Sequence, residues 1–354
     1  MHAHPTRRRT ALGLTAAGVL TLALAPSALA VTPANTAKLK KAGDTSLTLD
    51  KGAAKALKSL GVKVAPISPS KVKGGAVAFP ITSGDVDPKL TDGALINHSG
   101  GLTFSAGKTK VALKNFRIRI TSSQATISAA VGTSRATIIN LDTSKAKITR
   151  PGLNLRIANV GVKLNATGAS ALNKAFKVKA FKPGLKLGTA VVSAQFAQFI
   201  VESGNTTLTL DAGTLGAITG AGFAPAIIAP ATLTGAVATY PIVPSKIASD
   251  LTSGVITHSG GLSLTKGGTT TSATDFDIKL SANPSLAATI NGAPGAKVDI
   301  LNLDLAGLKQ TVSGQTVTLS GVAAKVNATL AGALGLPTAE GATLGTAVVT
   351  ANIR

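Results

Sequence analysis

The stretch Thr45-Ser46-Leu47-Thr48-Leu49-Asp50 returns almost unchanged as Thr206-Thr207-Leu208-Thr209-Leu210-Asp211. Further matching pairs follow in the same order: 93–101 with 254–261, 139–142 with 301–304, 162–167 with 324–329, and 187–192 with 344–349. The units of a short-period solenoid run roughly 20 to 50 residues, so this much longer spacing indicates a duplicated domain. We therefore predict a linker over 31–44, repeat 1 over 45–200 and repeat 2 over 201–354.

Alternating hydropathy predicts that each repeat consists mostly of β-strands. In 115–120 every second residue is apolar, which is the period of a half-buried strand. The matching stretch 275–280 keeps the apolar positions, whereas the polar position Arg117 becomes Asp277. A buried face should be retained and a solvated face should drift in this way. Breaks rich in Gly, Pro and Ser separate such runs, which favours an all-β fold of two tandem antiparallel sandwich-like or barrel-like domains.

Short helices are expected as minor elements. Apolar residues recur at helical spacing over 51–60, with Asp50 as a natural N-cap and Gly61 as a stop. Residues 172–176 predict a second turn or two of helix. The corresponding stretch 330–336 of repeat 2 is interrupted by glycine, which weakens its helical pattern.

The first 30 residues have the pattern of a secretory signal peptide. Arg7, Arg8 and Arg9 precede an apolar run over 11–25, and Ala28-Leu29-Ala30 supplies the small residues of a cleavage site. The alternative, a transmembrane anchor, needs a longer apolar run. We predict a secreted protein, extracellular or associated with the cell envelope, with no transmembrane segment in its mature chain. The adjacent arginines leave both the general secretory and the twin-arginine routes open.

Charge is divided unequally between the repeats. Residues 31–200 hold 26 Lys and Arg and 6 Asp, a net charge of +20, whereas residues 201–354 hold 7 basic and 8 acidic residues, a net charge of −1. A domain this basic attracts polyanions, so an anionic cell-wall polymer or a membrane surface is the expected partner of repeat 1. A merely solubilising surface is the alternative. Nucleic acid fits poorly, because aromatic residues make up 3% of the chain and form no stacking platform.

Two histidines remain after signal removal, His98 and His258, and both stand in a His-Ser-Gly-Gly-Leu step. One interpretation is a turn histidine whose ring bonds nearby backbone; the other is a ligand-binding residue. A serine hydrolase would need such a histidine to activate Ser99 or Ser259. Adjacent strand residues point to opposite faces, so this arrangement is disfavoured.

The sequence also does not support hydrolysis by a pair of carboxylates. Glu202 and Glu340, the only mature glutamates, have no counterpart in repeat 1. The recurring aspartates are explained by capping and turn roles. With cysteine absent as well, thiolate catalysis and thiolate metal sites are excluded. We predict that the protein is not an enzyme.

The segment from Gly93 through Ile120, with its His-Ser-Gly-Gly-Leu step, resembles the HtaA domain family of exported actinobacterial envelope proteins. The resemblance implies a duplicated β-rich domain that binds haem, with a tyrosine on the iron and a histidine supporting it. His98 and His258 would be the histidines. Tyr240, the only tyrosine, stands where repeat 1 has a phenylalanine, so repeat 1 departs from the family pattern.

These observations predict a secreted, non-catalytic binding or cell-envelope protein of HtaA-like type, with haem as its cofactor at His98, His258 and Tyr240 and no metal site of its own. The alternative is a basic, adhesin-like module that docks on anionic cell-wall polymer or lipid and binds no haem.

Overall fold

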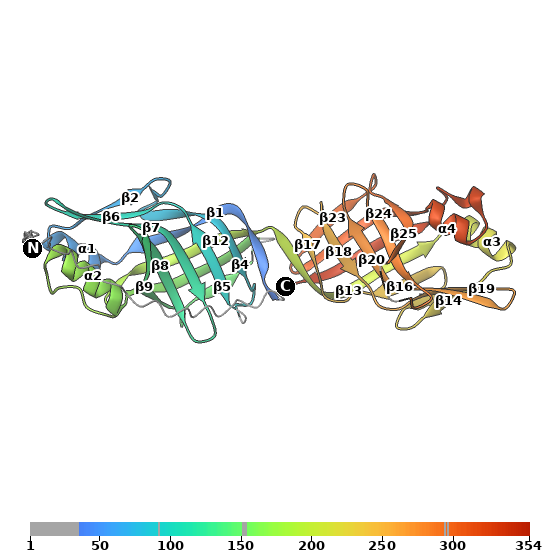
Figure 1. Ribbon diagram of the computed structural model, residues 1–354, viewed down its shortest axis with the longest axis horizontal. Helices are drawn as coiled ribbons and strands as arrows, with labels where there is room; N and C mark the ends of the chain where they lie inside the picture. The colour runs from blue at the N-terminus through green and yellow to red at the C-terminus, as the bar shows by residue number, and fades with distance from the viewer. Residues whose placement is uncertain (1–34, 91–92, 151–153, 294, 296) are drawn as a thin grey trace, which may run out of the picture. The chain divides into compact units, whose positions relative to one another are not determined.

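The computed structural model describes residues 35–90, 93–150, 154–293, 295 and 297–354. It shows two antiparallel sheets, each closed on itself, with a few short helices (Figure 1). The predicted all-β class with two barrel-like domains is confirmed. The predicted signal peptide, 1–30, lies outside the described residues. None of the described helices combines the length and the hydropathy that a membrane-spanning helix requires.

The first sheet uses the elements from residue 37 to residue 196. In chain order these are β1 (Ala37–Leu49), α1 (Lys51–Ser59), β2 (Lys63–Ile67), β3 (Lys71–Lys73), β4 (Ala76–Val86), β5 (Ala94–His98), β6 (Gly101–Ala106), β7 (Thr109–Ile120), β8 (Ala125–Val131), β9 (Ser134–Asp142), β10 (Lys147–Thr149), β11 (Asn154–Leu164), α2 (Ala166–Phe176) and β12 (Lys186–Phe196).

The second sheet uses the elements from residue 198 onward. These are β13 (Gln198–Leu210), α3 (Ala212–Gly220), β14 (Ala224–Ile228), β15 (Thr232–Thr234), β16 (Val237–Pro241), β17 (Ser245–Ala248), β18 (Gly254–Thr257), β19 (Gly261–Lys266), β20 (Thr269–Leu280), β21 (Ser285–Ile290), β22 (Val298–Asp304), β23 (Lys309–Ser313), β24 (Thr316–Val326), α4 (Ala328–Ala333), the 3₁₀ turn η2 (Pro337–Ala339) and β25 (Thr343–Ile353).

Both sheets close through pairing of two strands at equivalent positions in the two repeats. The first runs in the order β7-β5-β4-β1-β12-β11-β9-β8 and closes where β7 pairs with β8, with Ile118 opposite Ile127. The second closes where β20 pairs with β21, with Ile278 opposite Leu286. Matching sequence stretches therefore occupy matching places in the two barrels.

The strands extend beyond the limits that we expected for the repeats. β1 begins at Ala37, inside the expected linker 31–44, because Ala37 pairs opposite Val86 and is buried. Similarly, β13 begins at Gln198, before the expected start of repeat 2. The names repeat 1 and repeat 2 below refer to the first and the second barrel.

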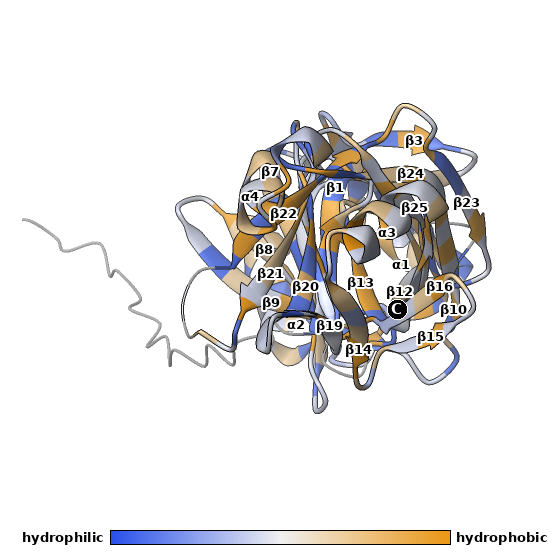
Figure 2. Ribbon diagram, turned by 90° about the vertical axis from the view of Figure 1, so that its right-hand side faces the viewer, coloured by the Kyte–Doolittle hydropathy of each residue, from blue (hydrophilic) through white to orange (hydrophobic). Residues whose placement is uncertain are grey.

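Alternation of apolar and polar residues builds each core. Leu155 and Ile157 of β11 are buried, whereas Asn154 and Arg156 beside them are exposed. Val317 and Leu319 of β24 are likewise buried, between half-buried neighbours. Figure 2 shows this alternation as bands of apolar and polar colour along the strands. Each large aliphatic side chain buried in this way contributes roughly 1.5–3 kcal/mol.

The helices follow the capping residues. Asp50 accepts hydrogen bonds from the amides of Gly52 and Ala53, which confirms the predicted start of α1. Asn165 caps α2, so this helix, with 11 residues, is longer than the one or two turns predicted around 172–176. Its counterpart α4 is capped in the same way by Asn327 and spans only six residues, as its glycine-interrupted sequence suggested.

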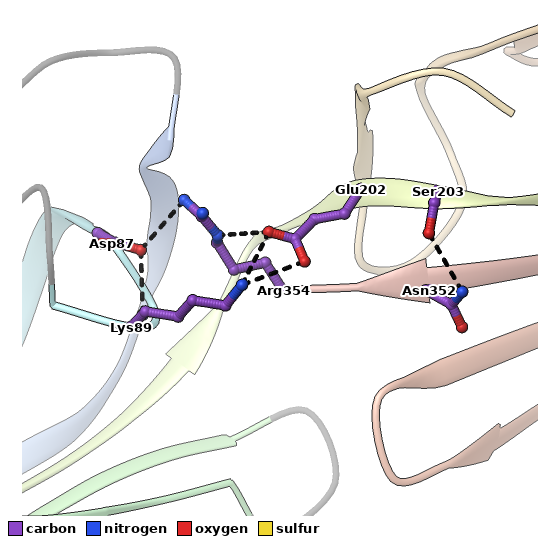
Figure 3. A network of polar contacts seen from close by, with 6 residues as sticks. All are labelled: Asp87, Lys89, Glu202, Ser203, Asn352 and Arg354. Atoms are coloured by element: carbon purple, nitrogen blue, oxygen red, sulfur yellow. Dashed lines mark hydrogen bonds and ion pairs between the residues drawn. The ribbon is translucent and has the colours of Figure 1, made fainter.

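A polar network joins residues of the two repeats (Figure 3). Glu202 of β13 accepts from Lys89 Nζ at 3.1 Å and from Arg354 Nε at 2.7 Å. Arg354 Nη1 also lies 3.6 Å from the buried Asp87. Repeat 1 thus supplies Asp87 and Lys89, and repeat 2 supplies the other two charged partners.

Candidate functional site

His98 lies in the interior of repeat 1, at the end of β5. It is 4% exposed. Its Nε2 lies 2.7 Å from Thr45 Oγ1, on β1, and its Nδ1 lies 3.1 Å from the carbonyl oxygen of Phe116, on β7. The ring therefore bridges three strands. The contact with the Phe116 carbonyl agrees with the interpretation of a histidine whose ring bonds nearby backbone.

These two contacts define the protonation state of the ring. A carbonyl oxygen only accepts, so Nδ1 carries the proton and donates to Phe116. In the neutral ring Nε2 is then an acceptor, and the Thr45 hydroxyl donates to it. Burial lowers the pKa of His98 to about 4, against weaker raising effects of the Phe116 carbonyl and Asp44. His98 is neutral at physiological pH.

Repeat 2 reproduces this arrangement. His258 is 2% exposed; its Nε2 lies 2.6 Å from Thr206 Oγ1, and its Nδ1 lies 3.1 Å from the Phe276 carbonyl. Burial lowers the pKa of His258 to about 4. Each repeat therefore contains a buried His–Thr pair, which we name the His–Thr pair throughout. Both threonines lie in the first matching stretch of the sequence, but their contact with histidines more than 50 residues away follows only from the strand order.

An aromatic pair lies beside each of these sites. In repeat 1 Phe79 packs edge-on against Phe116 at 5.1 Å, and in repeat 2 Tyr240 packs against Phe276 at the same distance. Tyr240 thus replaces a core phenylalanine. Burial raises the pKa of Tyr240 to about 12, so its hydroxyl stays protonated.

These residues do not fit an axial ligand set for haem iron. The Nε2 lone pair, which would have to bind iron, already accepts from threonine in both repeats. Tyrosinate ligation needs a neighbouring donor that stabilises the negative charge. His258 does not serve Tyr240 in this way, because its Nε2 is bonded to Thr206 and its Nδ1 proton to the Phe276 carbonyl. Both His258 and Tyr240 nevertheless line one cavity in repeat 2.

The histidines that a serine hydrolase would need, an arrangement that the sequence disfavours, contact no serine hydroxyl among the described hydrogen bonds. His98 Nε2 contacts Thr45 rather than a serine. Thr45 and Thr206 are each 5% exposed. No three His, Asp or Glu side chains of the described ranges gather closely enough to hold a metal ion.

A second feature is a cluster of lysines at the helical end of repeat 1. α1 and the segment after α2 meet there: the Asp50 amide donates to the Leu187 carbonyl, and the Gly184 amide to the Leu164 carbonyl (Figure 1). We define the basic cap as eight exposed lysines of this end: Lys51, Lys55, Lys58, Lys174, Lys177, Lys179, Lys182 and Lys186. The corresponding helix α3 of repeat 2 has no charged residue.

The fold and site define a class: a tandem pair of closed antiparallel barrels, each with a buried His–Thr pair and helices at one end. No protein-family model matches the chain, and no curated protein matches it.

Solved structures similar to this chain are HtaA domains of Corynebacterium glutamicum. The C-terminal domain of HtaA is 16% identical, with a TM-score of 0.35, and the match covers 45% of this chain and 99% of that one. A domain-swapped dimer variant of that domain is also 16% identical, with a TM-score of 0.31 and coverages of 41% and 90%. The N-terminal domain of HtaA is 14% identical, with a TM-score of 0.28 and coverages of 44% and 98%.

Proposed function

We propose that this protein is an exported, non-catalytic binding protein of the cell envelope that docks through the basic cap on a surface dense in phosphate or carboxylate groups. The observation that supports this proposal is the contrast between the repeats. Two barrels of one topology carry net charges of +20 and −1. The helical end of repeat 1 has eight exposed lysines, whereas the corresponding helix α3 of repeat 2 has no charged residue.

The basic cap is poorly neutralised by acidic groups. Lys186 lies 3.7 Å from Asp50, and no other lysine of the cap forms an ion pair with a described acidic side chain. Like charges held together in this way repel one another, so the fold itself gains nothing from them. A polyanion would relieve that repulsion, and the attraction would be screened within about 10 Å at 0.1 M salt.

The test is a binding assay against immobilised anionic wall polymer and, separately, against vesicles containing an anionic phospholipid. We expect binding that falls steeply from low to high salt. Lys51→Gln, Lys55→Gln and Lys58→Gln together should weaken it, because they remove three charges from the basic cap. The matched control replaces Lys38, Lys40 and Lys41 by Gln near the start of β1, at the opposite end of that strand from α1, and removes the same charge.

The two surfaces in that assay separate the sources of the anionic groups. Binding to polymer alone identifies a wall component, and binding to vesicles alone identifies a membrane surface. Binding that does not depend on salt, or that both triple variants weaken equally, would contradict docking through the basic cap.

Haem binding, with His98, His258 and Tyr240 as its residues, remains the alternative that the family resemblance implies. With both histidine nitrogens engaged, we expect haemin added to the protein to give no saturable, shifted Soret band. A shifted band that saturates and is lost in His258→Ala would restore the haem hypothesis for repeat 2.

A further inference from the structure

Repeat 2 encloses a cavity of about 330 Å³. Cavities that take small molecules have volumes of roughly 300–1,000 Å³, and an apolar cavity of about 150 Å³ already holds a benzene molecule. The walls come from the strands of the barrel and from α3 and α4, and they are mainly aliphatic, with Leu208, Ile218, Leu262, Leu330 and Leu344 among them. A site with these walls selects an apolar, flexible ligand.

The few polar side chains among the buried walls are largely committed to each other. Thr206 and His258 are hydrogen-bonded to one another and His258 is neutral. Tyr240 is protonated and 8% exposed. This buried part of the lining can therefore accommodate an aliphatic chain, but it offers no cation for an anionic group.

A cation lies instead beside the exposed part of the lining. Thr271 of β20 and Pro225 of β14 line the cavity and are exposed, on the two strands that flank β19. The cavity therefore reaches solvent beside β19, and we call this opening its mouth. Phe223 also lines it, and Lys266 Nζ lies 4.8 Å above the Phe223 ring. Lys266 forms no ion pair with an acidic side chain in the part of the chain that the structure describes. A lysine over an aromatic ring keeps its charge available to an anion at the mouth.

Repeat 1 differs at both places. Opposite Leu102 in the β6–β7 pair stands Leu113, whereas opposite Leu262 in the β19–β20 pair stands the smaller Ala273. The last residue of β6 is Ala106, whereas the last residue of β19 is Lys266. The helical end of repeat 1 is also filled by the buried Phe181, after the longer helix α2. The cavity and the lysine at its mouth, Lys266, thus occur together in repeat 2, which has few other lysines.

We propose that repeat 2 binds a single-chain aliphatic carboxylate, with its tail in the cavity and its carboxylate at the mouth beside Lys266. The tail would replace empty apolar volume, and the carboxylate would stay at the solvent boundary next to a positive charge. This site is separate from the basic cap, so it does not depend on docking by repeat 1.

The test uses dodecanoate as the probe and the full chain as the protein. Binding is followed by calorimetry and by the emission of Tyr240, the only tyrosine in a chain without tryptophan, which reports on the cavity itself. We expect one saturable site per chain, with a negative heat-capacity change from apolar burial.

Three variants assign the site. Ala273→Leu copies the residue of repeat 1 and occupies part of the cavity, so we expect affinity to fall roughly tenfold or more, because the larger side chain takes volume that the tail needs. Lys266→Ala should weaken dodecanoate roughly 2- to 5-fold, as expected for an exposed ion pair, and leave dodecanol binding unchanged. Lys309→Ala, on the fully exposed strand β23, is the matched charge control and should change neither ligand.

The contrary outcomes are equally specific. Absence of saturable dodecanoate binding, or binding that Ala273→Leu leaves intact while circular dichroism shows a native fold, would overturn the cavity as the site. Equal loss in Lys266→Ala and Lys309→Ala, or equal effects on dodecanoate and dodecanol, would overturn the carboxylate assignment.

Discussion

The two repeats share a pair of polar residues in their buried interiors and differ in the charged residues of their exposed surfaces. Both retain the buried His–Thr pair, with Nε2 to Oγ1 distances of 2.7 and 2.6 Å. Loss of either partner would leave a buried polar atom without a hydrogen bond, which is costly in any barrel interior. Replacing an exposed lysine carries no such penalty, so two barrels of the same topology can have net charges as different as +20 in repeat 1 and −1 in repeat 2. We therefore expect any function that differs between the repeats to depend on the features that they do not share: the basic cap of repeat 1 and the cavity of repeat 2.

The His–Thr pair should make both barrels sensitive to acid, which is the largest effect we expect. Both histidines have a folded pKa of about 4, below the ordinary value of 6.5. The unfolded chain therefore binds protons first as pH falls, so stability is fully present above pH 6.5 and is lost towards pH 4. At about 1.4 kcal/mol per pKa unit, each histidine contributes roughly 3 kcal/mol to this loss.

Urea unfolding at a series of pH values measures this effect. Far-ultraviolet circular dichroism follows both barrels, and Tyr240 emission follows repeat 2 alone. His98→Gln with His258→Gln should lower stability at pH 7 and flatten its dependence between pH 6.5 and 4.5. The aspartates whose pKa is lowered by lysine partners, such as Asp299 and Asp304, lose their contribution only below that window. A flat profile for the unmodified protein would contradict the buried, neutral state of both rings.

The sequence predicted the parts of the fold that depend on local patterns. Alternation in 115–120 and its match in 275–280 predicted β7 and β20, and the Asp50 cap predicted the start of α1. These signals are local because strand period and capping depend on neighbouring residues.

The site depended on contacts that no local pattern encodes. The histidines were singled out because their step recurs, but their partner Thr45 lies on a strand that becomes a near neighbour only when the sheet closes. Ala273, one of the residues that line the cavity, stands where repeat 1 has Leu113, and a hydropathy pattern treats these two apolar residues alike. Long-range register and interior volume are properties of the closed barrel, and so they required the structure.

Exchange of the residues at these two positions sharpens the comparison of the interiors. Leu113→Ala removes a buried side chain from repeat 1 and should cost about 2–5 kcal/mol, the usual range for such a truncation in a core. Ala273→Leu should not reproduce this loss in the opposite repeat, because the cavity accepts the extra atoms, and Tyr240 emission should report unchanged or increased stability. A loss of similar size in both variants would mean that repeat 2 is packed as densely as repeat 1.

The smallest effect should come from the threonine hydroxyls, and it should differ between the repeats. Thr45→Val keeps the shape of the side chain and leaves His98 Nε2 without a donor, at a cost of about 1–3 kcal/mol. Thr206→Val does the same to His258, but His258 lines the cavity, where a water molecule has room to replace the lost donor. Urea unfolding should therefore show a smaller loss for Thr206→Val in Tyr240 emission than for Thr45→Val in circular dichroism. Dodecanoate should displace that water. It should therefore increase the loss of unfolding free energy caused by Thr206→Val and leave the loss caused by Thr45→Val unchanged. Equal costs, unaffected by dodecanoate, would show that the cavity does not extend to the His–Thr pair of repeat 2.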